Sequence, residues 1–448
     1  MGEIVEPYDC TLNMTDIKSN NNKFYIMQIL KNNNEYCLYI NYGRIGETGR
    51  KSYEKGSLEY SIQKFKSQFK TKTKNNWDSR SDFKHYEGKY YLCDKYKPVN
   101  LELELSTKLK TNLDSRVVNL LQLIGNINML TNTLKILNID SSKLPLGAIS
   151  QEQLKKATDV LNQLQLEQDP EKIIQLSSKY YTLVPVETHR SKPPVIDNIT
   201  LLNSYRDKLD ELSNLKIAYT AVSDSDNTNT NTINKHPADM LYEKLDTIIT
   251  PIEKDGKLWN IIKDYIFNTT SDAHHCKVEL VDIYEINRKN EFNSPIENKH
   301  LLWHGTRLSN IISILKLGLL LRPEAISGVH ISGKMFGNGI YGANSFSKSF
   351  NYCSSQGEAC LFLAEFSLGA TQRLINAEYV TTSSLGDFNS VWGQGRNTPN
   401  SNTVFNNVII PNGKLVKSNI NAKLFHDEFI IYDTSQIKLK YIVHVKNA

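Results

Sequence analysis

The chain has 448 residues, of which 40% are hydrophobic and 23% are charged, and its formal net charge is +5. At roughly 100–200 residues per domain, this length predicts two to four domains. No apolar run approaches the roughly 18 residues that a membrane span needs, and the first residues lack the basic-then-apolar order of a signal peptide. We therefore expect a soluble intracellular protein that does not enter a membrane.

The charge and the cysteines limit the kinds of partner. The six cysteines form no C-x-x-C pair, so the sequence predicts neither a zinc site nor a disulfide framework. Residues 1–100 hold 17 Lys and Arg against 12 Asp and Glu, whereas the remaining chain is close to neutral. A basic module at one end indicates a polyanion partner that binds there.

Residues 1–100 carry short alternating runs at Lys23–Gln28 and Tyr36–Ile40, separated by the turn-prone stretch Lys31–Asn34. This pattern predicts a β-hairpin. A Gly-rich segment, Tyr42–Arg50, follows, and we expect a helix over Ser57–Phe69. The first domain is thus predicted to be a small sheet with one helix.

The residue pattern of the remaining chain changes twice. In residues 101–222, leucine and isoleucine recur at helical spacing, as in Val117–Ile124 and Leu154–Leu166, which predicts an α-helical domain. Residues 223–235 form a polar tract that cannot build a core, and we interpret them as a loop or linker. Residues 236–448 return to short β-type runs. The expected fold class is multidomain α+β: a small β-rich domain, a helical bundle domain and a mainly antiparallel β domain.

The first candidate site segment is Leu302–Arg307, in which a predicted strand ends at His304 and is followed by Gly305. Glycine lets a ligand approach the backbone closely, so Gly305 could offer its N–H and C=O groups to an amide. The alternative is that His304 has a structural role at the end of the strand, with its ring nitrogens hydrogen-bonded within the protein.

The second segment, Met335–Ala343, has G-x-G-x-x-G spacing. It follows no predicted strand and no βαβ unit surrounds it, so we do not expect a Rossmann dinucleotide site. We interpret it as a turn that presents Tyr341, with Tyr352 about one helical stretch later. Two aromatic faces could hold a flat ring such as nicotinamide between them.

The third segment begins with Glu428, directly before the apolar run Phe429–Tyr432. A carboxylate at the start of a strand either faces solvent or works in a cleft. This segment alone does not distinguish the two.

Together, the three segments resemble the catalytic domain of the poly(ADP-ribose) polymerase family both in their order along the chain and in their residues. The resemblance extends to the helical regulatory domain and to the WGR domain of the DNA-dependent members. The matching stretches are Trp303–Arg307, Met335–Tyr341, Ser347–Ser349 with Tyr352, and Glu428–Asp433; then Leu113–Val117, Lys143–Ser150 and Tyr180–Pro185; then Tyr42–Arg44, and Phe69–Trp77 with Gly88–Tyr90.

The resemblance implies that NAD is a substrate, that ADP-ribose passes to protein acceptors including the protein itself and to growing chains, and that no metal takes part. It assigns catalysis to Glu428, His304 and Tyr341, with Glu428 stabilising an oxocarbenium-like transition state. In this assignment Gly305 and Ser349 hold the carboxamide, the tyrosines stack on its ring, and His304 bonds the adenine-side ribose. The expected NAD-binding residues are His304, Gly305, Thr306, Asn310, Tyr341, Lys348, Ser349 and Tyr352.

For residues 1–100 the resemblance implies a sensor of DNA ends or breaks. The stretch Ser61–Trp77 has five lysines and no acid, which can neutralise phosphates, although a solvated helix face is the alternative. Arg44 is expected to be free to contact a phosphate, and Trp77 either contacts a sugar or, as we favour, fills the core. The expected DNA-binding residues are Tyr42, Arg44, Lys72, Lys74, Asn75, Trp77 and Arg80.

The three-domain order resembles the shorter DNA-dependent members and implies a nuclear monomer whose helical domain loosens on DNA and admits NAD. Four positions depart from the family pattern. Tyr42 replaces the Trp that names the WGR motif, and Gly342 follows Tyr341 where Phe is usual, which predicts a looser pocket wall. His426 and Asp427 precede Glu428 where polymer-forming members commonly show Tyr-Asn. Mono-ADP-ribosyl transfer and a DNA-binding scaffold with an inactive NAD site therefore stay open as alternatives.

Overall fold

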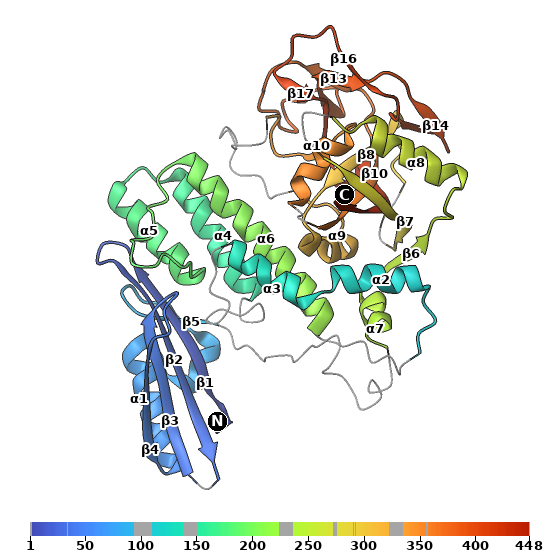
Figure 1. Cartoon of the computed structure of the whole chain (residues 1–448). Helices are drawn as coiled ribbons and strands as arrows, with labels where there is room; N and C mark the ends of the chain where they lie inside the picture. Colours follow the sequence, from blue (N-terminus) through green and yellow to red (C-terminus); the bar gives the residue numbers. More distant parts are fainter. Residues whose placement is uncertain are drawn as a thin grey trace. The chain divides into compact units, whose positions relative to one another are not determined.

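The computed structural model describes residues 2–33, 35–93, 110–137, 150–223, 236–271, 276–289, 291, 293–321, 335–354 and 357–447. The chain packs into two compact units, coloured along the sequence in Figure 1. The N-terminal unit comprises Met1–Leu101 and Ile127–Thr220, and the C-terminal unit comprises Glu102–Asn126 and Ala221–Ala448. Residues 224–235 of the predicted linker and residues 143–149 of the family motif lie outside the described residues.

The N-terminal unit begins with a five-stranded antiparallel sheet in the order β4-β3-β2-β1-β5. Its strands are β1 (Glu3–Asp16), β2 (Asn21–Asn32), β3 (Glu35–Arg44), β4 (Arg50–Gly56) and β5 (Tyr91–Cys93). The predicted hairpin is confirmed, because β2 and β3 pair with Met27 opposite Ile40. Both of these side chains are buried, as the alternating pattern requires for one face of a sheet.

Helix α1 (Leu58–Thr73) packs on this sheet and runs four residues beyond the predicted end at Phe69. Its start is fixed by Ser57, whose hydroxyl accepts a hydrogen bond from the Tyr60 amide. Its end is set by Lys74 in a left-handed conformation, with φ of 63°. The buried residues recur every fourth position, so one face of the helix meets the sheet.

The helices of the N-terminal unit are α3 (Ile127–Ile136), α4 (Gln151–Leu166), α5 (Pro170–Leu183) and the greater part of α6 (Ile199–Ser223). The predicted helical run Leu154–Leu166 is confirmed within α4. Ser150 and Asp169 cap the starts of α4 and α5. The helices meet through aromatic side chains, and the hydroxyls of Tyr181 and Tyr205 lie 2.6 Å apart.

Hydrogen bonds from backbone to side chain join the sheet to α5. The amide of Thr15 donates to the Thr182 hydroxyl at 2.9 Å, and the amide of Ile17 donates to the Ser178 hydroxyl at 3.1 Å. The Asn22 side chain donates to the Val186 carbonyl at 2.9 Å. The end of the β1–β2 hairpin is therefore fastened to α5 and to the segment that follows it.

Among the described residues, the C-terminal unit has three sheets, in the orders β14-β15-β8-β10-β19-β7-β6, β11-β12-β18-β9 and β16-β13-β17. Its strands are β6 (Thr247–Pro251), β7 (Val278–Arg288), β8 (Lys299–Gly305), β9 (Ile340–Gly342), β10 (Glu358–Ser367), β11 (Thr371–Leu374), β12 (Ser390–Gly393), β13 (Gly395–Pro399), β14 (Thr403–Phe405), β15 (Val408–Ile410), β16 (Leu415–Lys417), β17 (Leu424–His426), β18 (Glu428–Ile431) and β19 (Ile437–Asn447). The pairs within the run β8-β10-β19-β7-β6 are all antiparallel. The predicted multidomain α+β class, with a mainly antiparallel C-terminal part, is confirmed.

Helices cover the edges and faces of these sheets. They are α2 (Ser115–Ile124), α7 (Pro237–Lys244), α8 (Lys257–Asn268), α9 (Ile311–Leu317) and α10 (Phe346–Phe350). One hydrophobic core cluster joins Trp259 and Tyr265 of α8 to Trp303 of β8 and Phe346 of α10. None of the helices in the described ranges has the length and apolar character to cross a membrane.

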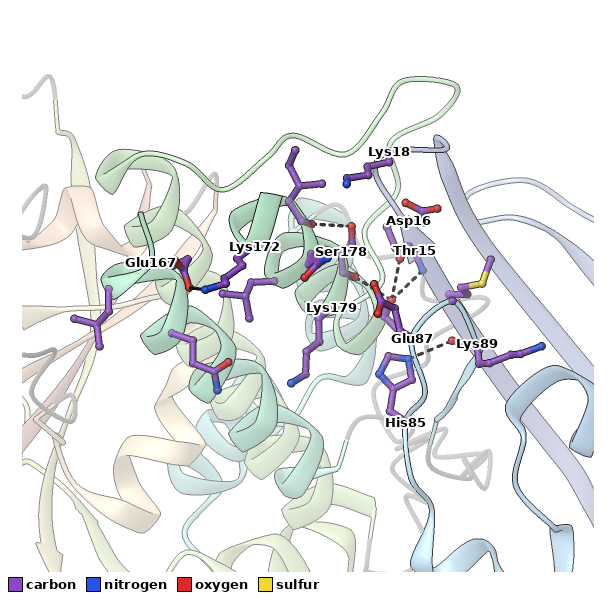
Figure 2. Close-up of a pocket in the computed structure, with 18 residues that line it drawn as sticks. Thr15, Asp16, Lys18, His85, Glu87, Lys89, Glu167, Lys172, Ser178 and Lys179 are labelled. Atoms are coloured by element: carbon purple, nitrogen blue, oxygen red, sulfur yellow. Dashed lines mark hydrogen bonds and ion pairs between the residues drawn. The ribbon is translucent and has the colours of Figure 1, made fainter. Parts of the chain in front are cut away.

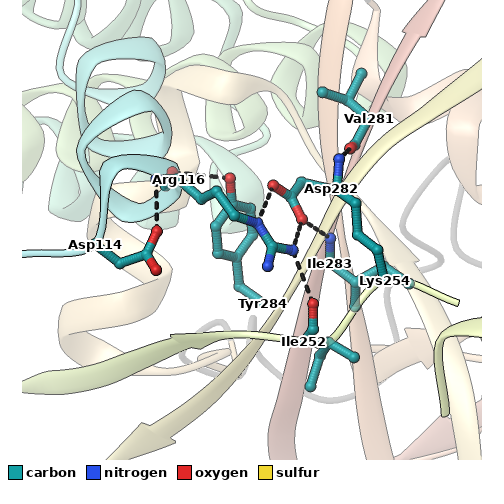
Figure 3. A network of polar contacts seen from close by, with 8 residues as sticks. All are labelled: Asp114, Arg116, Ile252, Lys254, Val281, Asp282, Ile283 and Tyr284. Carbon is teal, nitrogen blue, oxygen red and sulfur yellow. Dashed lines mark hydrogen bonds and ion pairs between the residues drawn. The ribbon is translucent and has the colours of Figure 1, made fainter. Parts of the chain in front are cut away.

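Helix α2 belongs to the C-terminal unit, although its sequence continues the helical pattern of residues 101–222. Figure 3 shows how Arg116 fastens it to β7: both carboxylate oxygens of Asp282 accept from the guanidinium, one of them from Nε at 2.8 Å. The guanidinium also donates to the Ile252 carbonyl, and the Tyr284 hydroxyl donates to the Arg116 carbonyl. The side chain of Asp282 is only 7% exposed, so this pair is the main polar contact that holds α2 to the sheet.

We predict that Asp282→Asn lowers the free energy of unfolding by roughly 1.5–3 kcal/mol, because the charge-assisted pair is broken and Arg116 keeps its charge without a carboxylate. Asp246→Asn is the matched control, since the Lys289–Asp246 pair is exposed and such pairs contribute about 0–1 kcal/mol. Urea unfolding of both variants measures the difference, and equal losses of stability would contradict the structural role given to Asp282.

Candidate active site

Two of the sheets of the C-terminal unit meet at one backbone bridge. The Trp303 amide donates to the Ala343 carbonyl at 2.9 Å, and the Ala343 amide donates back at 3.0 Å. This bridge brings the end of β8, with His304 and Gly305, beside β9, with Tyr341. On its other side β9 pairs with β18, with Tyr341 opposite Ile430. The three site segments predicted from the sequence therefore lie together around β9.

Gly305 lies against the backbone of α10. A Cβ atom at this position would stand 1.7 Å from the carbonyl oxygen of Ser349, so no other residue fits without moving the chain. Ser349 is itself buried, and its hydroxyl donates to the Trp303 carbonyl at 3.2 Å. The structure thus places these two predicted carboxamide-binding residues together.

The ring of His304 is oriented by β9. Its Nδ1 atom lies 3.0 Å from the Tyr341 carbonyl oxygen. Since a carbonyl only accepts, the Nδ1 atom of His304 carries a proton in this contact.

Tyr341 is fixed at its own hydroxyl, which donates to the Gly337 carbonyl at 2.8 Å and accepts from the Phe336 amide at 3.1 Å. Burial raises the pKa of Tyr341, so the hydroxyl stays protonated as this donor. Tyr352, in the 3-10 helix Asn351–Cys353, is 60% exposed. The predicted sandwich of a flat ring between the two tyrosines stays a prediction.

The Gly342 departure does not open the wall of the site. A Cβ at Gly342 would lie 2.7 Å from the ring of Phe366 and 3.1 Å from Leu302. The buried Phe366 ring therefore fills the space next to Gly342, contrary to the looser wall that the sequence predicted.

Glu428 and Lys348 form a half-buried ion pair. Lys348 Nζ lies 2.6 Å from Glu428 Oε1, and the two side chains are 15% and 12% exposed. Lys348 Nζ also lies 3.5 Å from the His426 carbonyl oxygen. Burial lowers the pKa of Lys348, whereas Glu428 and, more weakly, Asp427 raise it. Glu428 is therefore a held, shielded carboxylate and not the solvated strand-end acid that the sequence left open.

Thr306 and Asn310 lie together beyond the end of β8, and the Asn310 amide donates to the Thr306 hydroxyl at 3.1 Å. The Asn310 side-chain oxygen is buried and accepts no hydrogen bond from any described residue. An acceptor in this state suits a ligand that carries an O–H or N–H group.

Sequence reasoning did not assign a role to Asp427 or Asn344, which the structure joins beside Glu428. Asp427 is 1% exposed, and its carboxylate accepts from the Asn344 side chain and from the Gly395 amide, each at 2.7 Å. The sequence signals for Asp427 were its departure from the family pattern and the two successive carboxylates, Asp427 and Glu428, at the start of a strand.

Two of the expected DNA-binding residues in the N-terminal unit are engaged inside it. Trp77 is 3% exposed and packs edge-on against Phe65 and Phe69 at 4.8 and 5.0 Å, so it fills the core and does not face a sugar. Arg44 is not free: its guanidinium donates to the carbonyls of Asn20, His189 and Ser191. It ties the sheet to the segment after α5.

The other expected DNA-binding residues differ in exposure. Asn75 is a turn residue, with its side chain bonded to the Lys84 backbone, and Arg80 lies 4.3 Å over the Trp77 ring. Lys74 is exposed, and the exposed Tyr42 stacks on Tyr25 at 5.8 Å. Of the five lysines, Lys64 and Lys66 pair with Glu54 and Asp78.

Lys72 occupies a position with an excess of positive charge. It lies 4.6 Å over the Tyr25 ring, and burial first, then Lys23 and Lys89, lower its pKa. Lys23 and Lys89 therefore repel Lys72, and an anion bound beside Lys72 would relieve this repulsion.

A cavity of about 870 Å³ also lies in the N-terminal unit, bounded by the β1–β2 turn, residues 85–89, α4 and α5. Figure 2 shows lysines and acids side by side around it, among them Lys18, Glu87, Lys172 and Lys179. None of the predicted NAD-binding residues lines it.

The sequence of each part matches a known domain. The WGR domain matches residues 8–84, the poly(ADP-ribose) polymerase regulatory domain matches residues 111–242, and the poly(ADP-ribose) polymerase catalytic domain matches residues 258–447. Poly(ADP-ribose) polymerase 2-A of Oryza sativa subsp. japonica is 32% identical over 98% of this chain and 70% of its own length. The chain belongs to the poly(ADP-ribose) polymerase family.

Animal members of the poly(ADP-ribose) polymerase family are longer. Poly(ADP-ribose) polymerase 1 of Caenorhabditis elegans is 34% identical over 98% of this chain and 49% of its own length. The corresponding protein of Gallus gallus is 31% identical over 98% of this chain and 45% of its own length. The chain thus spans about half the length of these animal relatives.

The residues present fit the NAD substrate of this family. Gly305 lets the backbone of Ser349 pack directly against its own, and Asn310 offers a buried acceptor without a donor among the described residues. In this arrangement Gly305 and Ser349 would bind the carboxamide of NAD. His304 and the Asn310 side-chain oxygen would bind ribose hydroxyls. The site residues predicted from the sequence stay predictions of function, since these contacts are with substrate.

We predict that Gly305→Ala weakens NAD binding at least about 10-fold, because the new Cβ must push β8 and α10 apart at the carboxamide site. Gly357→Ala is the matched control, since no atom of the described residues lies within 4 Å of a Cβ there. Isothermal titration with NAD, beside a melting curve of each variant, measures the effect. Unchanged NAD affinity in Gly305→Ala would contradict the assignment of Gly305 to the carboxamide site.

Proposed function

We propose that the C-terminal unit transfers ADP-ribose from NAD to protein acceptors, including the protein itself, and releases nicotinamide. The observation that carries this proposal is the shielded Glu428 carboxylate, held 2.6 Å from Lys348 on the strand that pairs with the Tyr341 strand. Membership of the poly(ADP-ribose) polymerase family supports it.

The proposed reaction is a substitution at the anomeric carbon of the nicotinamide ribose. The bond from this carbon to the nicotinamide nitrogen breaks, and the bond to an acceptor oxygen forms as that oxygen loses its proton. Positive charge develops on the ribose ring as in glycoside chemistry. Glu428 stabilises this charge and orients the ribose 2′-hydroxyl or the acceptor hydroxyl, while His304, Gly305 and Ser349 hold the substrate in place.

Polymer formation and single transfer differ in the acceptor. We propose that the protein extends ADP-ribose chains as well as starting them, with mono-ADP-ribosyl transfer as the alternative. The alternative is favoured by one feature, the His426–Asp427 pair at the position where polymer-forming members show Tyr-Asn.

We further propose that the N-terminal unit binds DNA ends and that this binding stimulates transfer in a nuclear setting. The three cations Lys23, Lys72 and Lys89 support a phosphate contact, as does the exposed Lys74. Arg44 is bonded to backbone carbonyls of its own unit and Trp77 is buried in the core, so the DNA-binding proposal rests on the lysines. Imaging of a fluorescent fusion tests the nuclear location, and a signal excluded from the nucleus would remove it.

The first experiment incubates the purified protein with labelled NAD, with and without short double-stranded DNA ends, and reads the products on a denaturing gel. A smear that DNA strengthens indicates chain elongation, and a sharp band indicates mono-transfer. Labelling that DNA does not change would remove the proposed DNA sensing. Absence of labelling by folded protein in both tubes would favour the scaffold alternative.

We predict that Glu428→Gln lowers NAD turnover at least about 100-fold, because the charge that stabilises the transition state is removed, and that it also lowers the melting temperature, because Lys348 loses its buried partner. The matched control is Glu365→Gln, since Glu365 forms another half-buried pair, with Lys299 at 3.6 Å, outside the site. A scaffold with an inactive site would show equal, negligible turnover in wild type and both variants.

We predict that replacing Lys72 and Lys74 by Ala weakens DNA-end binding and reduces the slope of log affinity against log salt by about 1 for each phosphate that the protein no longer neutralises. Replacing Lys64 and Lys66, which already pair with acids, is the control and should change the slope less. Fluorescence anisotropy over a salt series measures both. An identical slope in the two double variants would exclude Lys72 and Lys74 as phosphate contacts.

A further inference from the structure

Asp427 is a buried carboxylate at the junction of three elements. Its Oδ1 accepts from the Gly395 amide, where β13 begins, and its Oδ2 accepts from the Asn344 side chain, between β9 and α10. It directly precedes Glu428, the first residue of β18. One side chain thus ties β13 and the β9–α10 connection to the start of the strand that carries Glu428.

The hydrogen bonds of Asp427 specify a carboxylate at this position. Both partners are N–H donors, and a carboxylate accepts from both. An amide in place of Asp427 keeps the contact with Asn344 only if the Asn344 amide turns over and accepts through its oxygen, and the Asn344 NH₂ group then loses its carboxylate acceptor. The same contact fixes the orientation of the Asn344 amide, whose oxygen is buried and accepts no hydrogen bond from the described residues.

Lys348 Nζ lies 3.5 Å from the carbonyl oxygen of His426, the residue before Asp427, and 2.6 Å from Glu428 Oε1, so both negative charges act on the lysine and raise its pKa. Each acid carries one negative charge and the lysine one positive charge, so the cluster has a net charge of about −1 with Lys348 protonated. The surroundings are nearly dry, since Asp427 is 1% exposed and Lys348 and Glu428 are 15% and 12% exposed. Charges in such a site interact more strongly than they would in water.

We propose that Asp427 is a positioning residue of the transfer reaction: it holds Lys348 against Glu428 by its charge and ties the strands around that pair through Gly395 and Asn344. This inference rests on the proposed ADP-ribosyl transfer. It assigns a mechanistic role to a departure from the family pattern, because polymer-forming members commonly have Asn directly before the glutamate.

The test compares Asp427→Asn, Asn344→Asp and the double variant Asp427→Asn/Asn344→Asp. The double variant restores both hydrogen bonds with donor and acceptor exchanged, but it moves the carboxylate from position 427 to position 344. We expect Asp427→Asn to lower both the melting temperature and kcat, kcat by about 10-fold or more, with little change in KM for NAD. The double variant should recover the melting temperature but not kcat. Asp264→Asn, an exposed change of the same net charge in α8, is the control.

A second readout follows the Lys348 proton. Glu428 and Asp427 are the acids that raise the pKa of Lys348, and Glu428 also adds to the raised pKa of Tyr341 and of Tyr352, after burial. Removing the Asp427 charge lowers the pKa of Lys348, so Lys348 loses its proton at lower pH. The alkaline limb of kcat/KM should move to lower pH in Asp427→Asn and in the double variant. An NMR titration of the Lys348 side chain measures the same shift without turnover.

The outcomes separate the possible failures. If the double variant recovers kcat together with the melting temperature, Asp427 is only a structural tether and the proposal is overturned. If neither variant moves the NMR titration of Lys348, its charge does not act on the lysine, which also overturns it. If the wild type consumes no NAD, the proposed transfer reaction is wrong, and the role of Asp427 in that reaction is wrong with it. The NMR titration of Lys348 still shows whether the Asp427 charge acts on the lysine.

Discussion

The half-buried pair of Lys348 and Glu428 is the interaction on which the catalytic half of the structure depends. Two charges that are 15% and 12% exposed are stable there only as partners, because each alone would lose its hydration without compensation. For them to meet, α10 must lie against the start of β18. The Trp303–Ala343 bridge and the pairing of β9 with β18 supply that geometry, since they fix β9 between β8 and β18.

Glycines around this pair allow backbones to approach where side chains would keep them apart. A Cβ at Gly305 would reach the Ser349 carbonyl, and a Cβ at Gly395 would stand 2.3 Å from the His426 carbonyl carbon. The close approach at Gly395 has a chemical consequence. It brings the Gly395 amide within 2.7 Å of Asp427 and so completes the hydrogen bonds of that carboxylate. Close backbone packing and buried charge therefore depend on each other in this unit.

Much of the fold could be predicted from the sequence, because the hairpin at Lys23–Ile40 and helix α4 follow from local periodicity. The roles of Arg44 and Asp427 could not. Arg44 looked exposed because its neighbours are glycines, yet its acceptors at His189 and Ser191 lie about 145 residues later in the chain. Asp427 finds its partners at Asn344 and Gly395, on two other elements. Local patterns carry no information on such distant partners.

The two units present opposite electrostatic environments, and the proposed chemistry requires both. A polyanion such as DNA is attracted by clustered cations, and Lys23, Lys72 and Lys89 provide them in the N-terminal unit. A ribose that becomes positive in its transition state is stabilised by negative charge, and Asp427 with Glu428 outweigh Lys348 in the C-terminal unit. The structure meets the two demands at separate sites, with the lysines in the N-terminal unit and the acids in the C-terminal unit.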